Sequence, residues 1–147
     1  GNAPGVNAQK RSNFTDIKKN LSYSMANPYP NTTAVNNGYK WNSTLGAEFA
    51  LVADMNPGKQ GTYDVTRPKV NSSTKDMQYA NSANHQQQGE SVLFGDGHVE
   101  FVQNPFCGTM RDNIYTQSGS TNGSNPTSSI YKDGPKWSGD SVMLPSL

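Results

Sequence analysis

The stretch from Ser91 to Val102, SVLFGDGHVEFV, decides the fold of this chain. It contains two short runs of apolar and aromatic residues, separated by Gly95-Asp96-Gly97. Asp-Gly is a favoured turn pair because Gly accepts a positive φ angle and Asp tolerates one. On the second run His98 and Glu100 alternate with Val99 and Phe101, so a strand there has one polar and one apolar face. The stretch predicts a β-hairpin.

A second strand is predicted at 48–54, EFALVAD, which is a continuous apolar run. It is bounded by Gly46 before and by Asn56-Pro57-Gly58 after, as is typical of a central strand that enters a tight turn. We expect this strand to lie in the core.

Residues 20–27 predict a third strand, because Leu21, Tyr23 and Met25 alternate with serines in the period-two pattern of a half-buried strand. A helix from Thr15 to Met25 is the competing interpretation, since apolar residues there are also spaced by four. The prolines of Asn27-Pro-Tyr-Pro30 end the run at once, which favours the strand.

The rest of the chain has the composition of loops. Of 147 residues, 17 are Asn, 16 Ser, 11 Thr and 14 Gly, residue types that favour turns. We expect a long surface loop over 60–88 with room for one helical turn at 75–81, a short strand at 112–116 and a low-complexity loop at 117–129. The predicted class is α+β, mainly β: a small antiparallel sheet with a central hairpin (about 91–102), long polar loops and little helix.

Charge and hydropathy limit the partners. The net charge is +1, so nucleic acid is not an expected partner, and no apolar run approaches the roughly 18–20 residues that cross a bilayer. Residues 1–19 read as an extended lead-in and 20–147 as one globular domain. The single cysteine, Cys107, cannot form an intramolecular disulfide and is expected to be a small buried residue.

The strongest candidate site in the residues themselves is Asp54, His85, Asp96 and His98. Imidazole and carboxylate groups together hold a divalent cation or pass a proton. The spacing matches no compact zinc motif, however. In the structural alternative Asp96 caps its own turn through side chain to backbone bonds, while His85 binds a neighbouring loop and fixes its approach.

A weaker candidate lies at 131–140, YKDGPKWSGD, where Asp133 and Asp140 flank Gly-rich turns. Oxygen-rich loops of this kind bind calcium. The segment lacks the ligand order of an EF-hand and has two lysines nearby, so two Asx-type turns are the alternative.

Residues 84–99, NHQQQGESVLFGDGHV, resemble the His-x(n)-Asp-Gly domain of prepilin-type, pseudopilin-like proteins of planctomycete-like bacteria. The motif comprises His85, Gly89, Asp96, Gly97 and His98, with ten residues between His85 and Asp96, one more than the usual spacing. Further stretches are similar to members of that family: 21–24, 27–30, 47–58 and 104–116. The resemblance covers most of residues 20–147.

The resemblance implies a structural role for the motif residues and no cofactor. Members of the family begin with a leader and a hydrophobic helix that anchors them in the membrane and forms the filament core, so residues 1–19 are expected to follow such a helix. The implied function is a non-catalytic subunit of a bacterial type II secretion or type IV pilus-like filament, outside the cytoplasm, whose partners are copies of itself or other pilin-like subunits. Only the preceding helix would contact the membrane.

Two other functions compete with this one. An extracellular carbohydrate- or partner-binding module would use Tyr39, Trp41 and Trp137 as stacking platforms with Asn-rich rims. A metal-dependent enzyme would be centred on His85, Asp96 and His98.

Overall fold

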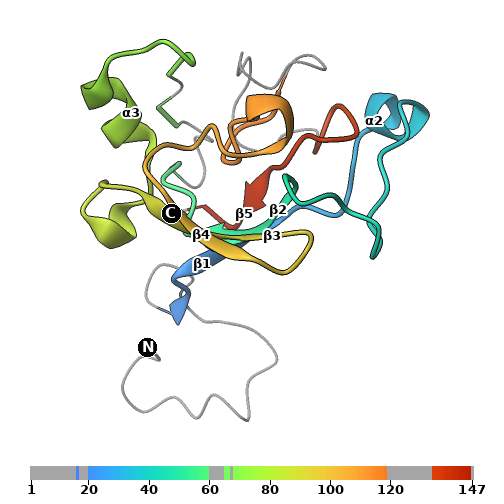
Figure 1. Cartoon of the computed structure of the whole chain (residues 1–147), viewed down its shortest axis with the longest axis horizontal. Helices are drawn as coiled ribbons and strands as arrows, with labels where there is room; N and C mark the ends of the chain where they lie inside the picture. Colours follow the sequence, from blue (N-terminus) through green and yellow to red (C-terminus); the bar gives the residue numbers. More distant parts are fainter. Residues whose placement is uncertain (1–15, 17–19, 60–64, 67, 119–133, 147) are drawn as a thin grey trace.

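The computed structural model describes residues 16, 20–59, 65–66, 68–118 and 134–146, which are arranged around one antiparallel sheet (Figure 1). The described strands are β1 (Tyr23–Ala26), β2 (Ala50–Asp54), β3 (Glu90–Phe94), β4 (Val99–Val102) and β5 (Met143–Leu144). Their order across the sheet is β4-β3-β2-β1-β5, and all neighbours are antiparallel. The predicted α+β, mainly β class is confirmed.

Short helices connect the strands. They are α2 (Thr32–Asn36), α3 (Thr74–Ala80) and the 3-10 turns η2 (Ala83–His85) and η3 (Thr109–Arg111). The side chain of Asn31 caps α2 by accepting from the Ala34 amide, and Ser73 caps α3 by accepting from the Asp76 amide. The helical turn expected near 75–81 is α3, whereas α2 was not predicted because Ala34 is its one buried residue.

The predicted hairpin is β3 and β4, with the four residues 95–98 between the two strands. The Gly97 amide donates to the Phe94 carbonyl at 2.9 Å, and the Phe94 amide donates to the His98 carbonyl at 3.0 Å. Gly97 has a φ of +92°, the left-handed geometry that this type of loop needs after its first turn. Leu93 therefore lies opposite Val99, and Ser91 opposite Phe101.

One face of the sheet carries the core. Ala26, Ala53, Val92 and Phe94 point to this inner face, and residues from the loops cover it. The covering side chains include Tyr39, Phe49, Ile114 and Tyr115, together with Met143 of β5. Cys107 is partly buried and packs against this cluster.

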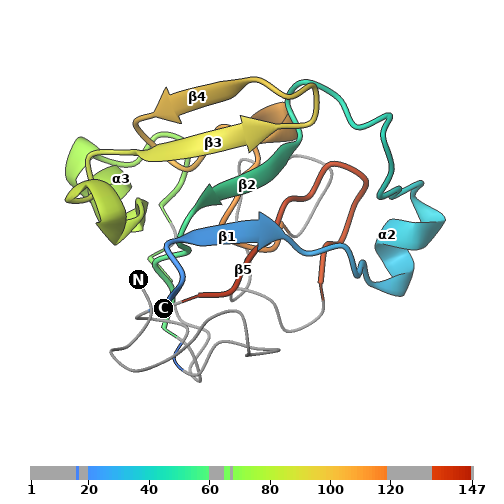
Figure 2. The same ribbon diagram turned by 90° about the horizontal axis from the view of Figure 1, so that it is seen from below.

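The opposite face is apolar as well. The strand register places Met25, Val52, Leu93 and Val99 in one row across four strands, and Tyr23 and Phe101 lie on the same side. We call these six residues the outer face. Val99 is 66% exposed, Tyr23 56%, Met25 51% and Phe101 50%, and Figure 2 shows β4, β3, β2 and β1 side by side toward the viewer.

Two expectations from the sequence need correction. The strand at 20–27 exists as β1 over Tyr23–Ala26, so the competing helix does not extend to Met25. The serine and alanine of β1 face the core, however, while Tyr23 and Met25 face outward. The reason is that the inner face is filled by loop residues, which leave room only for small side chains on β1. The strand predicted at 112–116 is wrong, because the Asn113 side chain accepts from the Tyr115 amide and makes a turn there.

Gly89 is the glycine whose replacement we expect to damage the sheet most directly. A Cβ at Gly89 would lie 2.2 Å from the carbonyl oxygen of Val102, whereas a Cβ at Gly46 would meet nothing within 4 Å. We therefore predict that Gly89→Ala lowers the free energy of unfolding by about 2 kcal/mol or more, and that Gly46→Ala leaves it within about 0.5 kcal/mol. Urea denaturation of the two variants checks this. If the two variants were equally stable, β3 and β4 would be able to separate around residue 89 without a loss in the free energy of unfolding.

Candidate functional site

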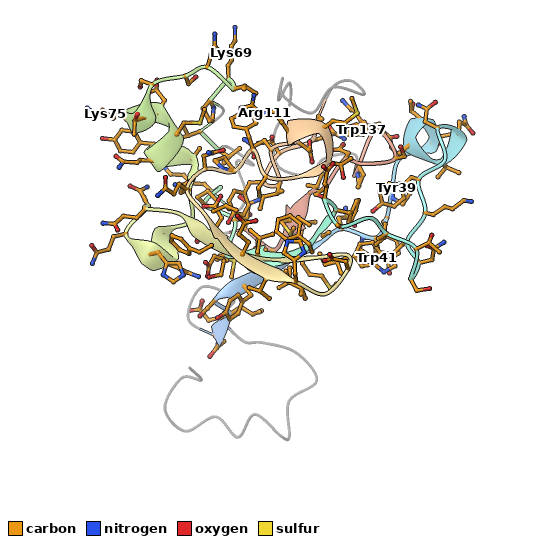
Figure 3. All side chains as sticks on the ribbon, in the orientation of Figure 1. Tyr39, Trp41, Lys69, Lys75, Arg111 and Trp137 are labelled. Atoms are coloured by element: carbon orange, nitrogen blue, oxygen red, sulfur yellow. The ribbon has the colours of Figure 1, made fainter. Side chains whose placement is uncertain are left out.

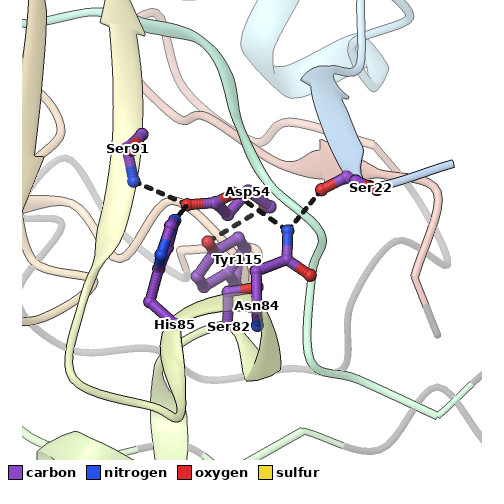
Figure 4. A network of polar contacts seen from close by, with 7 residues as sticks. All are labelled: Ser22, Asp54, Ser82, Asn84, His85, Ser91 and Tyr115. Atoms are coloured by element: carbon purple, nitrogen blue, oxygen red, sulfur yellow. Dashed lines mark hydrogen bonds and ion pairs between the residues drawn. The ribbon is translucent and has the colours of Figure 1, made fainter.

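A polar network surrounds the carboxylate of Asp54 at the end of β2 (Figure 4). Asp54 is 2% exposed. Its Oδ1 accepts from the Asn84 side chain at 2.8 Å, and its Oδ2 accepts from the backbone amide of Ser91 at 2.7 Å. His85 Nε2 lies 2.9 Å from the same Oδ2. The carboxylate thus joins β2, β3 and the η2 turn.

The local sequence explains why η2 reaches Asp54. Ser82 caps the turn by accepting from the Asn84 amide, and Gln86 and Gln87 adopt positive φ angles of 55° and 62°, which reverse the chain toward β3. The Asn84 side chain also donates to the Ser22 carbonyl at 2.6 Å. The turn is therefore held to both β1 and β2.

His85 packs between this network and the hairpin. Its side chain is 45% exposed, and its ring meets Phe101 edge-on with 5.3 Å between ring centroids. On the other side of Asp54, the Tyr115 hydroxyl donates to the Asp54 carbonyl at 3.0 Å. Both contacts fix the position of β2 relative to its neighbours.

Asp96 and His98 form a separate pair in the hairpin turn. The Asp96 Oδ1 accepts from the His98 amide at 3.1 Å and lies 2.5 Å from His98 Nδ1. These backbone and side-chain hydrogen bonds from His98 lower the pKa of Asp96 below its usual value. The His98 ring stacks on Phe94 with 4.6 Å between centroids. Asp96 makes the turn-capping contact that the structural alternative describes.

The four residues of the sequence-based site are therefore divided. Asp54 and His85 meet at the start of β3, while Asp96 and His98 meet in the turn beyond its other end. The expectation that one constellation unites them is wrong, because β3 separates the two pairs. Among the residues that the structure describes, no group of three or more His, Cys, Asp and Glu side chains is placed to hold a metal ion.

Glu90 is a buried acid that the sequence reasoning missed. It is 0% exposed, and neither carboxyl oxygen has a hydrogen-bond partner within the described part of the chain. Burial, with a smaller contribution from the charge of Asp54, raises the pKa of Glu90 to about 8. The signal was present in the sequence, because Glu90 has the same parity as the inward-facing Val92 and Phe94.

Two buried aspartates, Asp112 and Asp140, hold the C-terminal segment. Asp140 accepts from the amides of Ser118 and Lys136 at 3.1 and 2.7 Å, and Asp112 accepts from the Ser118 hydroxyl and from the Ser141 amide at 2.8 Å. Burial raises the pKa of Asp140 to about 7, and it raises that of Asp112 well above its usual range with help from the charge of Asp140.

One of these aspartates, Asp140, is also one of the two candidate calcium ligands. Asp140 Oδ1 accepts from the Ser118 amide and Oδ2 accepts from the Lys136 amide, so this side chain ties two segments together. It does not form an Asx turn, in which the side chain accepts from the amide two residues further on. Asp133, the other candidate, lies outside the described residues. Calcium at this segment stays a prediction.

Cys107 lies near the buried acids. Burial, and then the charges of Glu90 and Asp112, raise the pKa of its thiol well above the usual value. A thiol in this surrounding stays protonated near neutral pH and is a weak nucleophile.

The aromatic residues singled out in the sequence gather at the α2 end of the molecule (Figure 3). Phe49 makes edge-on contacts with Tyr39 and Trp41, at centroid distances of 6.4 and 6.2 Å. Tyr39 is 7% exposed and donates its hydroxyl to the Asn27 carbonyl at 2.9 Å, so it anchors the loop and offers no free face. Trp41 is 40% exposed, and Trp137 lines a neighbouring cavity.

Comparison with known proteins found no match: no family model, no curated protein and no solved structure resembles the chain closely enough to align with it. None of the described helices is long and apolar enough to span a bilayer.

Removal of the Asp54 carboxylate is expected to destabilise the fold. Asp54→Ala leaves the Ser91 amide and the Asn84 side chain without their acceptor, so we predict a loss of about 2–4 kcal/mol in the free energy of unfolding. Asp96→Ala, in an exposed turn, should lose much less. Thermal and urea denaturation compare the two variants. A fully stable Asp54→Ala protein would mean that the carboxylate is kept for chemistry and not for folding.

Glu90 is expected to make stability fall with rising pH. The folded state holds its proton up to about pH 8, whereas the unfolded chain loses it near 4.5, so the free energy of unfolding decreases between these values. Glu90→Gln removes this contribution. The variant should match the parent near pH 4.5 and exceed it by on the order of a few kcal/mol at pH 8.

Urea denaturation from pH 4.5 to 8 measures the difference, with Glu100→Gln on the exposed strand β4 as the matched control. The Asp112 and Asp140 pair adds a slope of the same sign to parent and variants alike, so only the difference between curves counts. Parallel curves for the parent and Glu90→Gln would exclude Glu90 as the proton-holding group.

Proposed function

We propose that this chain is the globular domain of a non-catalytic structural subunit in a bacterial, extracytoplasmic filament of the type II secretion or type IV pilus-like kind. The observation that carries the proposal is the apolar outer face of the sheet, which the described residues leave uncovered. The resemblance of residues 84–99 to the His-x(n)-Asp-Gly domain of pseudopilin-like proteins supports the same function.

The outer face has the properties of a surface that becomes buried. Its row of Met25, Val52, Leu93 and Val99 runs across four strands, and the described residues leave four of the six side chains at least half exposed. Soluble monomers rarely leave a contiguous apolar patch of this kind in water. A sheet with two apolar faces is stable when a second layer covers each of them.

We assign the cover to the apolar helix that, as the resemblance implies, residues 1–19 follow in the same protein. The Asn20 amide donates to the Asp16 carbonyl at 3.1 Å, the four-residue spacing of an α-helical hydrogen bond, and β1 begins three residues later. Tyr23 and Met25 then lie on the outer face. A helix that leads into β1 is therefore connected to the edge of the face it would cover.

The motif residues fit a structural role. His85 anchors the η2 turn to Asp54, and Gly89 allows the close approach of the Val102 carbonyl. Asp96 and Gly97 shape the hairpin loop. Each residue fixes the position of a strand that contributes to the outer face, so the motif supports an assembly surface and not a reaction centre.

The test compares two double variants of the full-length gene product in its own bacterium. Met25→Glu with Val99→Glu places charges on the outer face, whereas Met110→Glu with Val35→Glu changes the same residue types at equally exposed positions away from it. All four positions are at least half exposed in the domain itself, so both purified domains should fold. In the full-length protein Met25 and Val99 would lie under the helix, and charges there are expected to displace it. We predict that only the outer-face variant is lost from sheared filaments, as measured by immunogold electron microscopy and mass spectrometry.

Two further readouts complete the test. Circular dichroism of the purified domains controls for folding, and N-terminal analysis of the native protein asks whether an apolar helix precedes residues 1–19. The proposal is wrong if the native protein never occurs in filaments, or if both double variants assemble as well as the parent.

A further inference from the structure

The loop between α2 and β2 and the turn at 137–139 line an open cavity of about 580 Å³. Its apolar wall is formed by Leu45, Phe49 and Trp137. The rim is polar and consists of Lys40, Asn42, Thr44, Glu48 and Ser138. A small-molecule site typically has a volume of about 300–1,000 Å³ and an apolar wall with a few polar groups, which is the pattern seen here.

The wall is held in place by packing. The Trp137 indole is 5% exposed, and a Cβ at Gly139 would lie 2.5 Å from its ring, so the indole lies directly against this backbone. Phe49 is fixed between Tyr39 and Trp41 by edge-on contacts. Because these aromatic side chains are already fixed, they lose little conformational entropy when a ligand binds in the cavity.

Trp41 supplies an open aromatic surface beside the cavity. Its neighbours in sequence, Lys40 and Asn42, are both on the rim, and its ring contacts the wall residue Phe49. With 40% of its surface exposed, Trp41 keeps part of the indole free for stacking.

The charges of the rim narrow the class of ligand. The rim carries one lysine, Lys40, and one glutamate, Glu48, and is otherwise neutral and polar. Such a rim does not concentrate positive charge for a phosphate or negative charge for a cation. It does offer hydrogen-bond donors and acceptors to hydroxyl groups, while the Trp41 indole beside it offers a flat apolar surface. Saccharides combine an apolar C–H face with a ring of hydroxyls, and they match both features.

We propose that this cavity binds an uncharged saccharide, with Trp41 as the stacking platform and Asn42, Lys40 and Glu48 as partners of its hydroxyls. The site lies on loops at the α2 end of the molecule, and the outer face is formed by the strands. The inference therefore goes beyond the proposed function and does not depend on it.

The two tryptophans make the test direct. The chain has two Trp residues, 41 and 137, so its tryptophan emission reports on this cavity and its edge. Cellotriose, chitotriose, maltotriose and mannotriose are titrated separately, with ATP and trigalacturonate as anionic comparisons. We expect at least one neutral trisaccharide to shift the emission with a Kd below about 1 mM, confirmed by isothermal titration calorimetry.

Variants locate the site. Trp41→Ala should weaken binding at least about tenfold in calorimetry, and Trp41→Tyr should restore most of the affinity because a smaller aromatic face remains. Tyr79→Ala removes an aromatic side chain that is 50% exposed on α3 and serves as the matched control, with unchanged affinity expected. Circular dichroism verifies that each variant is folded.

Three results would overturn the inference. They are no binding of any neutral trisaccharide at about 10 mM by a folded chain, binding of the anionic comparisons alone, and saccharide binding that persists unchanged in Trp41→Ala.

Discussion

The carboxylate of Asp54 is the contact on which the rest of the structure depends. It lies at the end of β2 and accepts hydrogen bonds from the first part of β3 and from the η2 turn. These segments are about 30 to 37 residues away in the sequence, so one buried side chain closes the long connection between β2 and β3. A buried carboxylate is tolerated when donors surround it, and here amide groups and His85 supply them.

Both faces of the sheet are apolar, but the described residues cover only one of them. Loops from 39–49 and 105–118 cover the inner face, and the described residues leave the outer face open. A chain with 32% hydrophobic residues has few apolar side chains to place, yet it keeps six of them together on the outside. This arrangement favours assembly over catalysis as the role of the sheet, while the loops at the α2 end offer a separate surface for a ligand.

Polar groups take an unusual share of the interior. Glu90, Asp112 and Asp140 are all fully buried, and burial raises the pKa of each carboxyl. The cost differs among them, because the two aspartates accept hydrogen bonds from backbone amides whereas Glu90 has no hydrogen-bond partner among the described residues. The aspartates tie the C-terminal segment to the loop at 112–118, and Glu90 makes the stability of the domain sensitive to pH.

The sequence by itself determined the hairpin, the strand at β2 and the class of the fold, because turn chemistry and strand periodicity are local properties. The alternation in β1 was also visible, but tertiary packing decided which of its faces is buried, since loop residues distant in sequence fill the space over the inner face. The same holds for the candidate site. His85 was recognisable from its motif, yet its partner is Asp54 and not Asp96, because the η2 turn folds back on the start of β3 and the hairpin loop lies at the other end of that strand.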